Sequence, residues 1–398
     1  MEGRQKLTNP ACFPPLPPPA SYHQPPVTNH LSPFTLLLPP FSLQISPMPR
    51  PRLDPAIFHL PVEKMRAGYY SDKYFVRARD ILQADHCSPQ VTVQVFGKAA
   101  ALLGGIDEAI AILKLCSDDW SHLEVKALYD GDTISPWEVV LEIEGPYDEF
   151  AHLETLYLGV LARRTRVGTN TRRVVDAARP KDVMFFPARH DHWLVQTGDG
   201  YAAHIAGAIG VSTDAQASWW GSEGIGTVPH GLIAAYGGDT VLASRKFLEH
   251  VTPDIRLVTL VDFENDCVRT SLELAEALGS RLYGVRLDTS ELLVDTSVLP
   301  MMGRFKPTGV TPQLVHNVRD ALDRAGHTGV HIVVSGGFTA EKIREFETLG
   351  VPVNTYGVGS SLFLGRFDFT ADVVKKDGRP CAKVGREYRP NPRLTRVT

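Results

Sequence analysis

The chain has 398 residues, enough for a barrel of roughly 200 to 250 residues and a smaller second domain. Its 45 acidic and 41 basic side chains give a net charge of -4, which argues against a nucleic-acid-binding or membrane-surface protein. The five cysteines form no C-x-x-C pair, so neither a zinc knuckle nor a disulfide scaffold is indicated, and we expect a cytoplasmic protein.

Residues 1–52 differ in composition from the rest of the chain, because 14 of the 30 prolines fall there. Proline fixes the backbone φ angle and lacks an amide proton, so we expect neither a helix nor a central strand in this segment. The composition predicts a disordered leader, with a partner-binding polyproline arm as the alternative. The apolar run 34–45 is interrupted by prolines and is not typical of a signal peptide, and no run has the length of a membrane span.

Residues 53–152 are expected to form a smaller α+β domain with an open sheet. Segments 90–96 and 138–144 alternate apolar and polar residues, a pattern typical of strands with one buried face. In chain order, the expected elements are helices at 63–66 and 72–85, a strand at 90–96, a helix at 107–115, and strands at 125–128 and 138–144.

Residues 153–366 predict a (β/α) barrel, complete or incomplete, with an open parallel sheet as the alternative. Short apolar strands that alternate with amphipathic helices are typical of parallel βα units. Helices are expected at 153–164, 170–178, 266–278, 312–325 and 340–349, and strands at 183–187, 257–262, 282–288, 330–335 and 353–357. Residues 367–398 are expected to return to the first domain through a hairpin at Asp377-Gly378, a strong turn signal.

The ends of two consecutive barrel strands are rich in glycine. One strand ends in Ser335, Gly336 and Gly337, and the next is followed by Gly357, Gly359 and Ser360. Glycine allows close approach of the backbone, and amides at the start of a helix attract anions, so the paired loops favour a phosphate site. Each loop could instead be a simple tight turn.

Charged residues end two further strands. Alternation along a strand sends Arg286 and Asp288 to the same side. A carboxylate at Asp288 suits Mg²⁺ or sugar hydroxyls and could offset positive charge on a ribosyl carbon, whereas a plain salt bridge with Arg286 is the alternative. Asp262 ends an earlier strand and could simply cap the next helix.

Two earlier loops carry histidines. Arg189 follows an apolar run, where a planar guanidinium suits bidentate binding of a carboxylate. His190 and His192 form an H-x-H pair without a third ligand nearby, and we assign no metal ligands. His230 follows a glycine turn that includes Thr227, and it is either a nucleophile or proton-transfer group or a capping residue.

These residues form an ordered series of motifs. In chain order they are F-x-A-R-H, G-T-V-P-H, V-R-L-D-T, V-S-G-G-F and Y-G-V-G-S-S, and residues 69–75 and Glu154-Thr155 accompany them. Together they resemble type II phosphoribosyltransferases, closest to nicotinate phosphoribosyltransferase. The resemblance covers about residues 67–367. It is more specific to the superfamily than to the substrate.

The resemblance implies transfer of 5-phosphoribosyl from phosphoribosyl diphosphate to nicotinate, with Mg²⁺ and coupling to ATP hydrolysis, in NAD biosynthesis. It implies that Tyr74 stacks on the pyridine across a homodimer interface and that Arg189 binds the carboxylate. It further implies that the two glycine loops hold the 5′-phosphate, that Asp288 faces the ribose and diphosphate, and that ATP phosphorylates His230. The remaining substrate contacts are expected from His190, Thr213, Thr227 and Arg286.

The chain departs from the family pattern at two places. Where F-G-x-R-R is common, it has Pro187 and His190, and the lost charge could weaken diphosphate binding or mark a different acceptor. The family's threonine-serine-asparagine turn appears as V-S-T-D, which contains Thr213 and adds Asp214 near anionic substrates.

Two other functions stay open. Quinolinate phosphoribosyltransferase would need a denser basic pocket, for which the arginines between 163 and 173 are candidates, although a helix points them in several directions. A non-catalytic barrel that binds a phosphate ligand is the second alternative. Nicotinamide as acceptor is disfavoured by Arg189.

Overall fold

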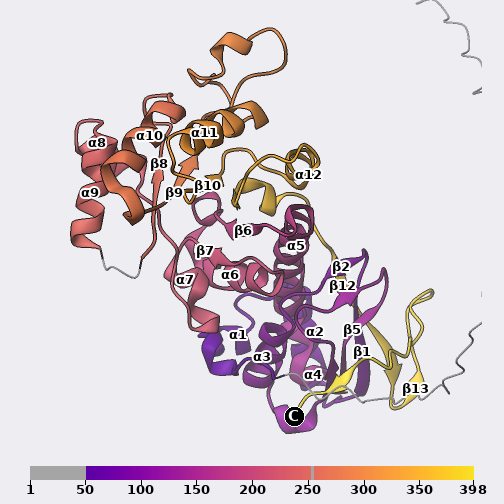
Figure 1. Cartoon of the computed structure of the whole chain (residues 1–398). Coiled ribbons are helices and arrows are strands. Elements are labelled where there is room, and N and C mark those ends of the chain that lie inside the picture. Colours follow the sequence, from indigo (N-terminus) through magenta and orange to yellow (C-terminus); the bar gives the residue numbers. More distant parts are fainter. Residues whose placement is uncertain (1–50, 252–254) are drawn as a thin grey trace, which may run out of the picture. The chain divides into compact units, whose positions relative to one another are not determined.

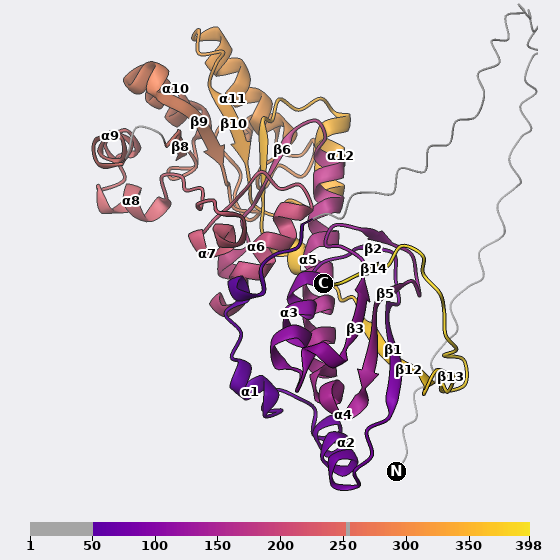
Figure 2. The same cartoon turned by 90° about the horizontal axis from the view of Figure 1, so that it is seen from below.

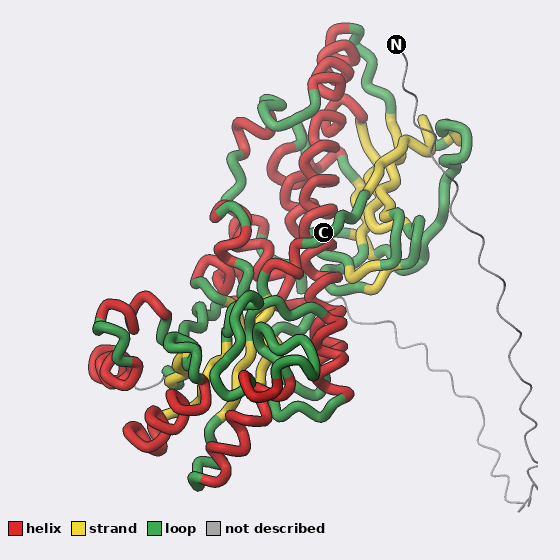
Figure 3. The backbone as a smooth tube through the Cα atoms, turned by 90° about the horizontal axis from the view of Figure 1, so that it is seen from above, coloured by secondary structure: helices red, strands yellow, loops and turns green. Residues whose placement is uncertain are grey.

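The computed structural model describes residues 51–251 and 255–398, so the predicted leader lies outside the described residues except for its last two positions. The described chain contains an antiparallel sheet of order β13-β12-β1-β5-β3-β14 and a parallel sheet of order β7-β6-β11-β10-β9-β8 (Figure 1). Figure 3 shows the two sheets as separate groups of strands with helices beside each. No helix within these residues is both long and apolar enough to span a membrane.

The antiparallel sheet combines strands from both ends of the described chain. Its strands are β1 (Gln90–Gly97), β3 (Glu124–Ala127), β5 (Val139–Pro146), β12 (Phe369–Lys376), β13 (Arg379–Pro380) and β14 (Thr395–Arg396). The helices of this region are α1 (Val62–Arg66), α2 (Lys73–Ala84), α3 (Ile106–Cys116) and α4 (Tyr147–Phe150), and β2 (Ala101–Leu102) pairs with β4 (Thr133–Ile134). The strands predicted between 90 and 144 and the helix at 107–115 are therefore confirmed.

The C-terminal segment pairs with the first half of the chain. β12 lies antiparallel to β1, and β14 lies antiparallel to β3. The hairpin predicted at Asp377-Gly378 is confirmed, since both residues have positive φ and link the paired strands β12 and β13. Figure 2 shows α3 on one side of the sheet and the C-terminal segment, in yellow, along the other.

One long helix, α5 (Glu154–Ala178), replaces the two helices predicted at 153–164 and 170–178. The prediction of a break was wrong because the buried face of the middle turns packs against β2. Thr165 Oγ1 accepts a hydrogen bond from the Gly104 amide at 3.1 Å, and Thr169 Oγ1 accepts one from the Leu102 amide at 3.0 Å. These tertiary hydrogen bonds offset the weak helix propensity of threonine.

The parallel sheet consists of short apolar strands, as predicted. They are β6 (Asp182–Phe185), β7 (Gly210–Val211), β8 (Leu257–Leu260), β9 (Leu282–Leu287), β10 (His331–Val334) and β11 (Thr355–Val358). The helices that follow them are α6 (Gln196–Ile205), α7 (Asp214–Ala217), α8 (His230–Ala235), α9 (Thr240–His250), α10 (Cys267–Leu278), α11 (Pro312–Arg324) and α12 (Ala340–Thr348). The predicted strands and the three predicted helices after residue 260 are confirmed.

The parallel sheet is curled, and segment 225–228 contacts both of its edge strands. The Ile225 amide donates to the Val211 carbonyl at 2.7 Å, and the Val228 amide donates to the Val258 carbonyl at 3.0 Å. All neighbouring strands of the sheet run parallel, so their carboxyl ends meet at one edge. This edge brings together the loops that sequence analysis singled out.

Candidate functional site

A cleft of about 760 Å³ opens at the carboxyl ends of the parallel strands. Most of the predicted site residues line it: Arg189, His190, Thr227, His230, Arg286, Asp288, Ser335, Gly336, Gly337, Gly357, Gly359 and Ser360. Strands far apart in the sequence contribute these residues, and the curl of the sheet brings them to one site.

Tyr74 and Thr213 do not line this cleft. Tyr74 lies on α2, beside the antiparallel sheet, and is 61% exposed. Thr213 is the N-cap of α7, where its Oγ1 accepts a hydrogen bond from the Gln216 amide at 3.2 Å and donates one to Gln196. The neighbouring Ser212 lines the cleft instead.

Two glycine loops lie on one wall of the cleft. Gly336 and Gly337 have φ angles of 84° and 68°, in the left-handed region that favours glycine, and they connect β10 to α12. A Cβ at Gly359 would lie 2.9 Å from the His190 ring, so a side chain there would collide with the opposite loop. Ser361 Oγ donates to the Phe338 carbonyl at 2.8 Å and links the two loops.

Arg286 and Asp288 belong to a hydrogen-bonded network at the end of β9. Arg286 Nε donates to Ser335 Oγ at 2.8 Å, and Ser335 Oγ donates to Asp288 Oδ1 at 2.7 Å. Arg286 Nη2 lies 3.3 Å from Asp288 Oδ2, so the salt bridge considered from the sequence is present. Both residues of this salt bridge also line the cleft, so Asp288 can belong to the salt bridge and still contact a ligand.

Arg286 also contacts the far side of the cleft. Its Nη1 donates to Thr227 Oγ1 at 3.4 Å, and its guanidinium carbon lies 4.9 Å from the centre of the Phe186 ring. Burial lowers the pKa of Arg286, whereas the carboxylates of Asp288 and Asp262 oppose that shift. The guanidinium remains charged, because an arginine keeps its proton in proteins.

His230 is held by a carboxylate that sequence analysis did not assign to the site. His230 Nε2 lies 2.9 Å from Asp262 Oδ1. This hydrogen bond raises the pKa of His230, and burial opposes the shift. Because Nε2 donates to Asp262, Nδ1 is left as the free ring nitrogen.

The capping roles considered for these two residues are wrong. The N-cap of α8 is Pro229, and the N-cap of α10 is Asp266, whose side chain accepts from the Arg269 amide. The position of Asp262 at a strand end was visible in the sequence, but its contact with His230 joins two loops 32 residues apart and required the fold.

Arg189 lies in the loop after β6, is exposed, and forms no hydrogen bond or ion pair with any described residue. His192 does not join it, because His192 Nδ1 accepts a hydrogen bond from the Leu194 amide and the residue lies outside the lining of the cleft. Within residues 51–251 and 255–398, no group of three or more His, Cys, Asp or Glu side chains could hold a metal ion.

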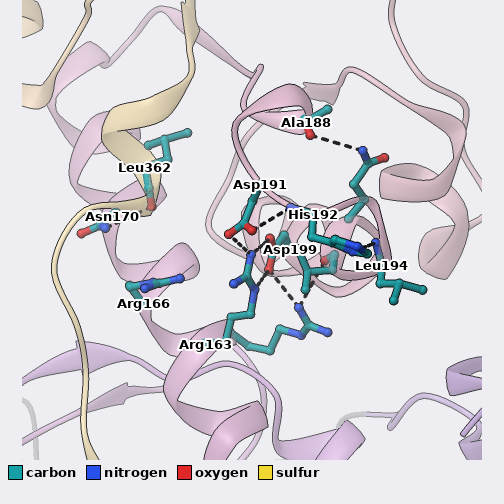
Figure 4. Close-up of polar contacts among 12 residues, drawn as sticks. Arg163, Arg166, Asn170, Ala188, Asp191, His192, Leu194, Asp199 and Leu362 are labelled. Carbon is teal, nitrogen blue, oxygen red and sulfur yellow. Dashed lines mark hydrogen bonds and ion pairs between the residues drawn. The ribbon is translucent and has the colours of Figure 1, made fainter. Parts of the chain in front are cut away.

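Two of the five arginines between 163 and 173, Arg163 and Arg164, are neutralised by carboxylates, whereas Arg166 and Arg172 donate to backbone carbonyls. Arg163 donates to both oxygens of Asp199, at 3.0 and 2.7 Å, and Figure 4 shows it between Asp191 and Asp199. Arg164 bonds Asp199 at 2.9 Å and Glu108 at 2.9 Å. These two arginines therefore add little net charge for a dicarboxylate acceptor.

Two aromatic residues of the cleft received no role in the sequence analysis. Phe186 and Phe338 both line it. Phe186 is the first letter of the motif F-x-A-R-H, and Phe338 is the last letter of V-S-G-G-F, so the motifs contained the signal. Phe338 is buried in the core beneath the cleft, whereas Phe186 is half-buried, so only Phe186 presents an accessible ring to the cleft.

Comparison with known proteins identifies the family of this chain. The family model "Quinolinate phosphoribosyl transferase, N-terminal domain" matches residues 72–165. A solved nicotinate-nucleotide pyrophosphorylase from Pyrococcus furiosus is 31% identical, with a TM-score of 0.72 and coverage of 85% of each chain. The chain belongs to the nicotinate and quinolinate phosphoribosyltransferase family. Human nicotinic acid phosphoribosyltransferase shares the fold, with a TM-score of 0.56 at 18% identity over 78% of this chain and 75% of that chain.

Two curated members of the family come from Mycobacterium tuberculosis. The nicotinate phosphoribosyltransferase pncB1 is 30% identical over 268 residues, which are 65% of this chain and 55% of that protein. The nicotinate phosphoribosyltransferase pncB2 is 27% identical over 262 residues, which are 64% and 52%. The chain thus spans about half the length of the curated relatives that it matches.

Proposed function

We propose that the protein is a nicotinate phosphoribosyltransferase that forms nicotinate mononucleotide and diphosphate in NAD biosynthesis, with coupling to ATP hydrolysis. One observation carries the proposal. A single cleft combines the guanidinium of Arg189, which has no polar partner in residues 51–251 and 255–398, with two glycine loops and the carboxylate of Asp288. An aromatic acid and a sugar phosphate need these groups side by side.

Each part of the two substrates has a candidate contact. Arg189 binds the carboxylate of nicotinate, and the ring lies against Phe186, whose face also contacts Arg286. The loops Ser335 to Gly337 and Gly357 to Ser360 bind the 5′-phosphate through backbone amides and the Ser360 hydroxyl, since the Ser335 hydroxyl already donates to Asp288. His190 and Thr227 border the space between these two subsites.

The transfer forms one bond and breaks another. The lone pair of the pyridine nitrogen forms a bond to C1 of the ribose, and the bond from C1 to the diphosphate oxygen breaks with its electron pair on the diphosphate. Positive charge develops at C1 as the leaving group departs. Asp288, held in place by Arg286 and Ser335, supplies a fixed negative charge close to it.

Mg²⁺ is the ion that the family implies, and the cleft lining offers it one carboxylate, Asp288. Mg²⁺ usually binds one or two carboxylates and completes its shell with substrate phosphates and water. Asp288 is the carboxylate of the cleft lining that would hold it, and its partners among the described residues are Arg286 and Ser335. When bound, the ion would neutralise charge on the diphosphate.

ATP coupling is proposed to act through His230. With Nε2 bonded to Asp262, Nδ1 can attack the γ-phosphorus of ATP, so that an N–P bond forms and the bond to ADP breaks. The exposed side of the imidazole opens into the same cleft as Asp288. Phosphorylation there would improve binding of phosphoribosyl diphosphate, and hydrolysis of phosphohistidine would drive the reaction forward.

Tyr74 is proposed to act in a homodimer. It lies outside the cleft of its own chain, and the adjacent Tyr69 and Tyr70 are also exposed, at 69% and 46%. A second copy that covers these rings would allow Tyr74 to reach the nicotinate ring. The proposed cytoplasmic location rests on the five cysteines, which form no pair that indicates a disulfide scaffold.

Quinolinate is the second candidate acceptor, since the matching N-terminal family model carries that name. The ion pairs of Arg163 and Arg164 count against it, because a dicarboxylate needs additional free cations and these two are neutralised. Arg166 and Arg172, which donate to backbone carbonyls, are the arginines of this helix that would have to supply the charge. Nicotinamide would leave Arg189 without a partner.

Diphosphate release from phosphoribosyl diphosphate and Mg²⁺ tests the proposal, with nicotinate, quinolinate or nicotinamide, each with and without ATP. We expect release with nicotinate that rises with ATP. Release with quinolinate alone would reassign the acceptor, and no release with any acceptor would refute the proposal in favour of a non-catalytic barrel.

A further inference from the structure

One side of α5 contacts both segments that frame the cleft. Arg163, Arg166 and Asn170 are spaced i, i+3 and i+7, so they lie along one face of the helix. Figure 4 shows Arg163 beside Asp191 and Asn170 beside Leu362. The first contact reaches the loop that carries Arg189, and the second reaches the segment that follows the phosphate loop.

The guanidinium of Arg163, which contacts Asp191, is held in place by further hydrogen bonds. Arg163 Nη2 donates to Asp191 Oδ2 at 2.8 Å, while Nε and Nη2 also bond Asp199. Asp199 is only 1% exposed and belongs to α6. Since the guanidinium is already held by a buried carboxylate, it presents a fixed donor to Asp191.

Asp191 is two residues beyond Arg189 in a loop with few other anchors. Gln196 Nε2 donates to the Ala188 carbonyl at 3.3 Å, and the His190 amide donates to the Pro187 carbonyl at 2.8 Å. Arg189 itself forms no polar contact with a described residue. The side chain of Asp191 is therefore the charged anchor of the loop.

The contact at Asn170 is independent of this anchor. Asn170 Nδ2 donates to the carbonyls of Leu362 and Leu364, at 3.1 and 2.9 Å. Leu364 lines the cleft and follows Ser360 of the phosphate loop. The same face of α5 thus contacts the loop of Arg189 through Arg163 and the segment after the phosphate loop through Asn170.

We propose that the Arg163–Asp191 ion pair is a positioning device that sets the place of Arg189, and hence of the acceptor, relative to the phosphate loop. Asn170 positions the phosphate side separately. This inference rests on the proposed function, which identifies nicotinate as the acceptor that Arg189 binds. Transfer requires the pyridine nitrogen and C1 of the ribose to lie within about 3.5 Å of each other. Because α5 contacts both loops, a shift of the Arg189 loop relative to α5 would move the acceptor away from the ribose.

The test uses Asp191→Ala and Asn170→Ala in the full chain, because Arg163 keeps Asp199 as a partner in both variants. Hydrogen–deuterium exchange and steady-state kinetics are measured on each. Asp191→Ala should speed exchange about tenfold in residues 186–192, leaving aside the His192 amide, which itself donates to Asp191 Oδ1. It should also raise the KM for nicotinate about tenfold, with the KM for phosphoribosyl diphosphate within about twofold. Asn170→Ala should show the reverse pattern, with faster exchange in residues 359–365.

Two comparisons make the result decisive. Asp176→Ala removes an exposed ion pair with Arg179 on the same helix and should change neither exchange nor either KM. Asp191→Asn keeps a hydrogen-bond acceptor and should fall between the wild type and Asp191→Ala. A merely structural role would lower the active fraction, and so kcat, without separating the two KM values.

Failure of this inference can be told from failure of the proposed function. If the wild type does not use nicotinate, the proposed function fails, and local exchange in residues 186–192 still decides the positioning role. If the wild type is active but Asp191→Ala leaves exchange and the nicotinate KM unchanged, or speeds exchange throughout the protein, the positioning role is refuted.

Discussion

The two sheets of this protein treat their polar side chains differently. In the antiparallel sheet, Gln94 and Glu142 are buried but bonded, since Gln94 Nε2 donates to Glu142 at 2.8 Å and to the Arg389 carbonyl at 2.9 Å. At the ends of the parallel strands, Arg286, Ser335 and Asp288 also bond one another. There, however, Arg189 and the Nδ1 atom of His230 have no polar partner among the described residues. Buried polar groups with partners stabilise a fold, whereas free polar groups around a cleft are available to a ligand.

This difference predicts that changes in the parallel region affect turnover and that changes in the antiparallel region affect stability. Asp288→Asn is expected to have the largest effect, a fall in kcat of about 10² to 10³-fold, because the fixed charge near C1 is lost. Diphosphate release measures it, and the thermal midpoint should stay close to that of the wild type. Asp320→Asn, which affects only an exposed pair with Arg324, is the control. An unchanged rate would remove Asp288 from the mechanism.

Arg189→Ala should raise the KM for nicotinate by about 10 to 100-fold, since a charge-assisted pair with the carboxylate is worth about 1.5–3 kcal/mol. The KM for phosphoribosyl diphosphate should change little. Saturation curves for the two substrates measure the difference. Equal rises in both KM values would show that Arg189 does not bind the acceptor specifically.

His230→Ala should reduce the stimulation by ATP to none while a slow ATP-independent reaction remains, because the nitrogen that accepts the phosphoryl group is lost. The rate with ATP divided by the rate without ATP is the quantity to measure. Survival of that ratio in the variant would disprove phosphorylation of His230.

The pH dependence of ATP coupling should follow His230. The hydrogen bond to Asp262 raises the pKa of His230, and only the neutral ring can attack phosphorus. Stimulation should therefore increase as the pH rises through that pKa. Asp262→Asn removes the cause of the shift, so its midpoint should move to lower pH in rate profiles taken with ATP. A midpoint that stays in place would exclude His230 as the titrating group.

Gln94→Ala should affect stability but leave turnover unchanged. It would remove the bonds to Glu142 and to both backbone groups of Arg389, and buried groups left unpaired cost about 1–3 kcal/mol. Urea unfolding measures the loss. Gln90→Ala, at the exposed start of the same strand, is the matched control. A larger change in kcat than in stability would contradict the contrast between the two sheets.

Local patterns in the sequence predicted most strands and several helices. The apolar runs before Asp262 and Asp288 reflect burial of both strand faces, a property of neighbouring residues. The alternation of residues 90–96 predicted the strand correctly but not its burial, since its polar residues are buried under the C-terminal segment. The break predicted within α5 failed because Thr169 bonds Leu102 of β2 and Thr165 bonds Gly104 just after it, a segment distant in sequence. The short β7 has too few residues to show a period.

The sequence by itself determined which residues end the strands of the parallel sheet and therefore which loops carry the glycines, Arg189, His230 and Asp288. It could do so because strand burial and turn chemistry are local. The tertiary structure alone decided that Asp262 bonds His230 and that Arg163 holds Asp191. The first contact joins loops around β8, and the second joins α5 to the loop after β6, so their geometry depends on how the sheet curls and where α5 packs.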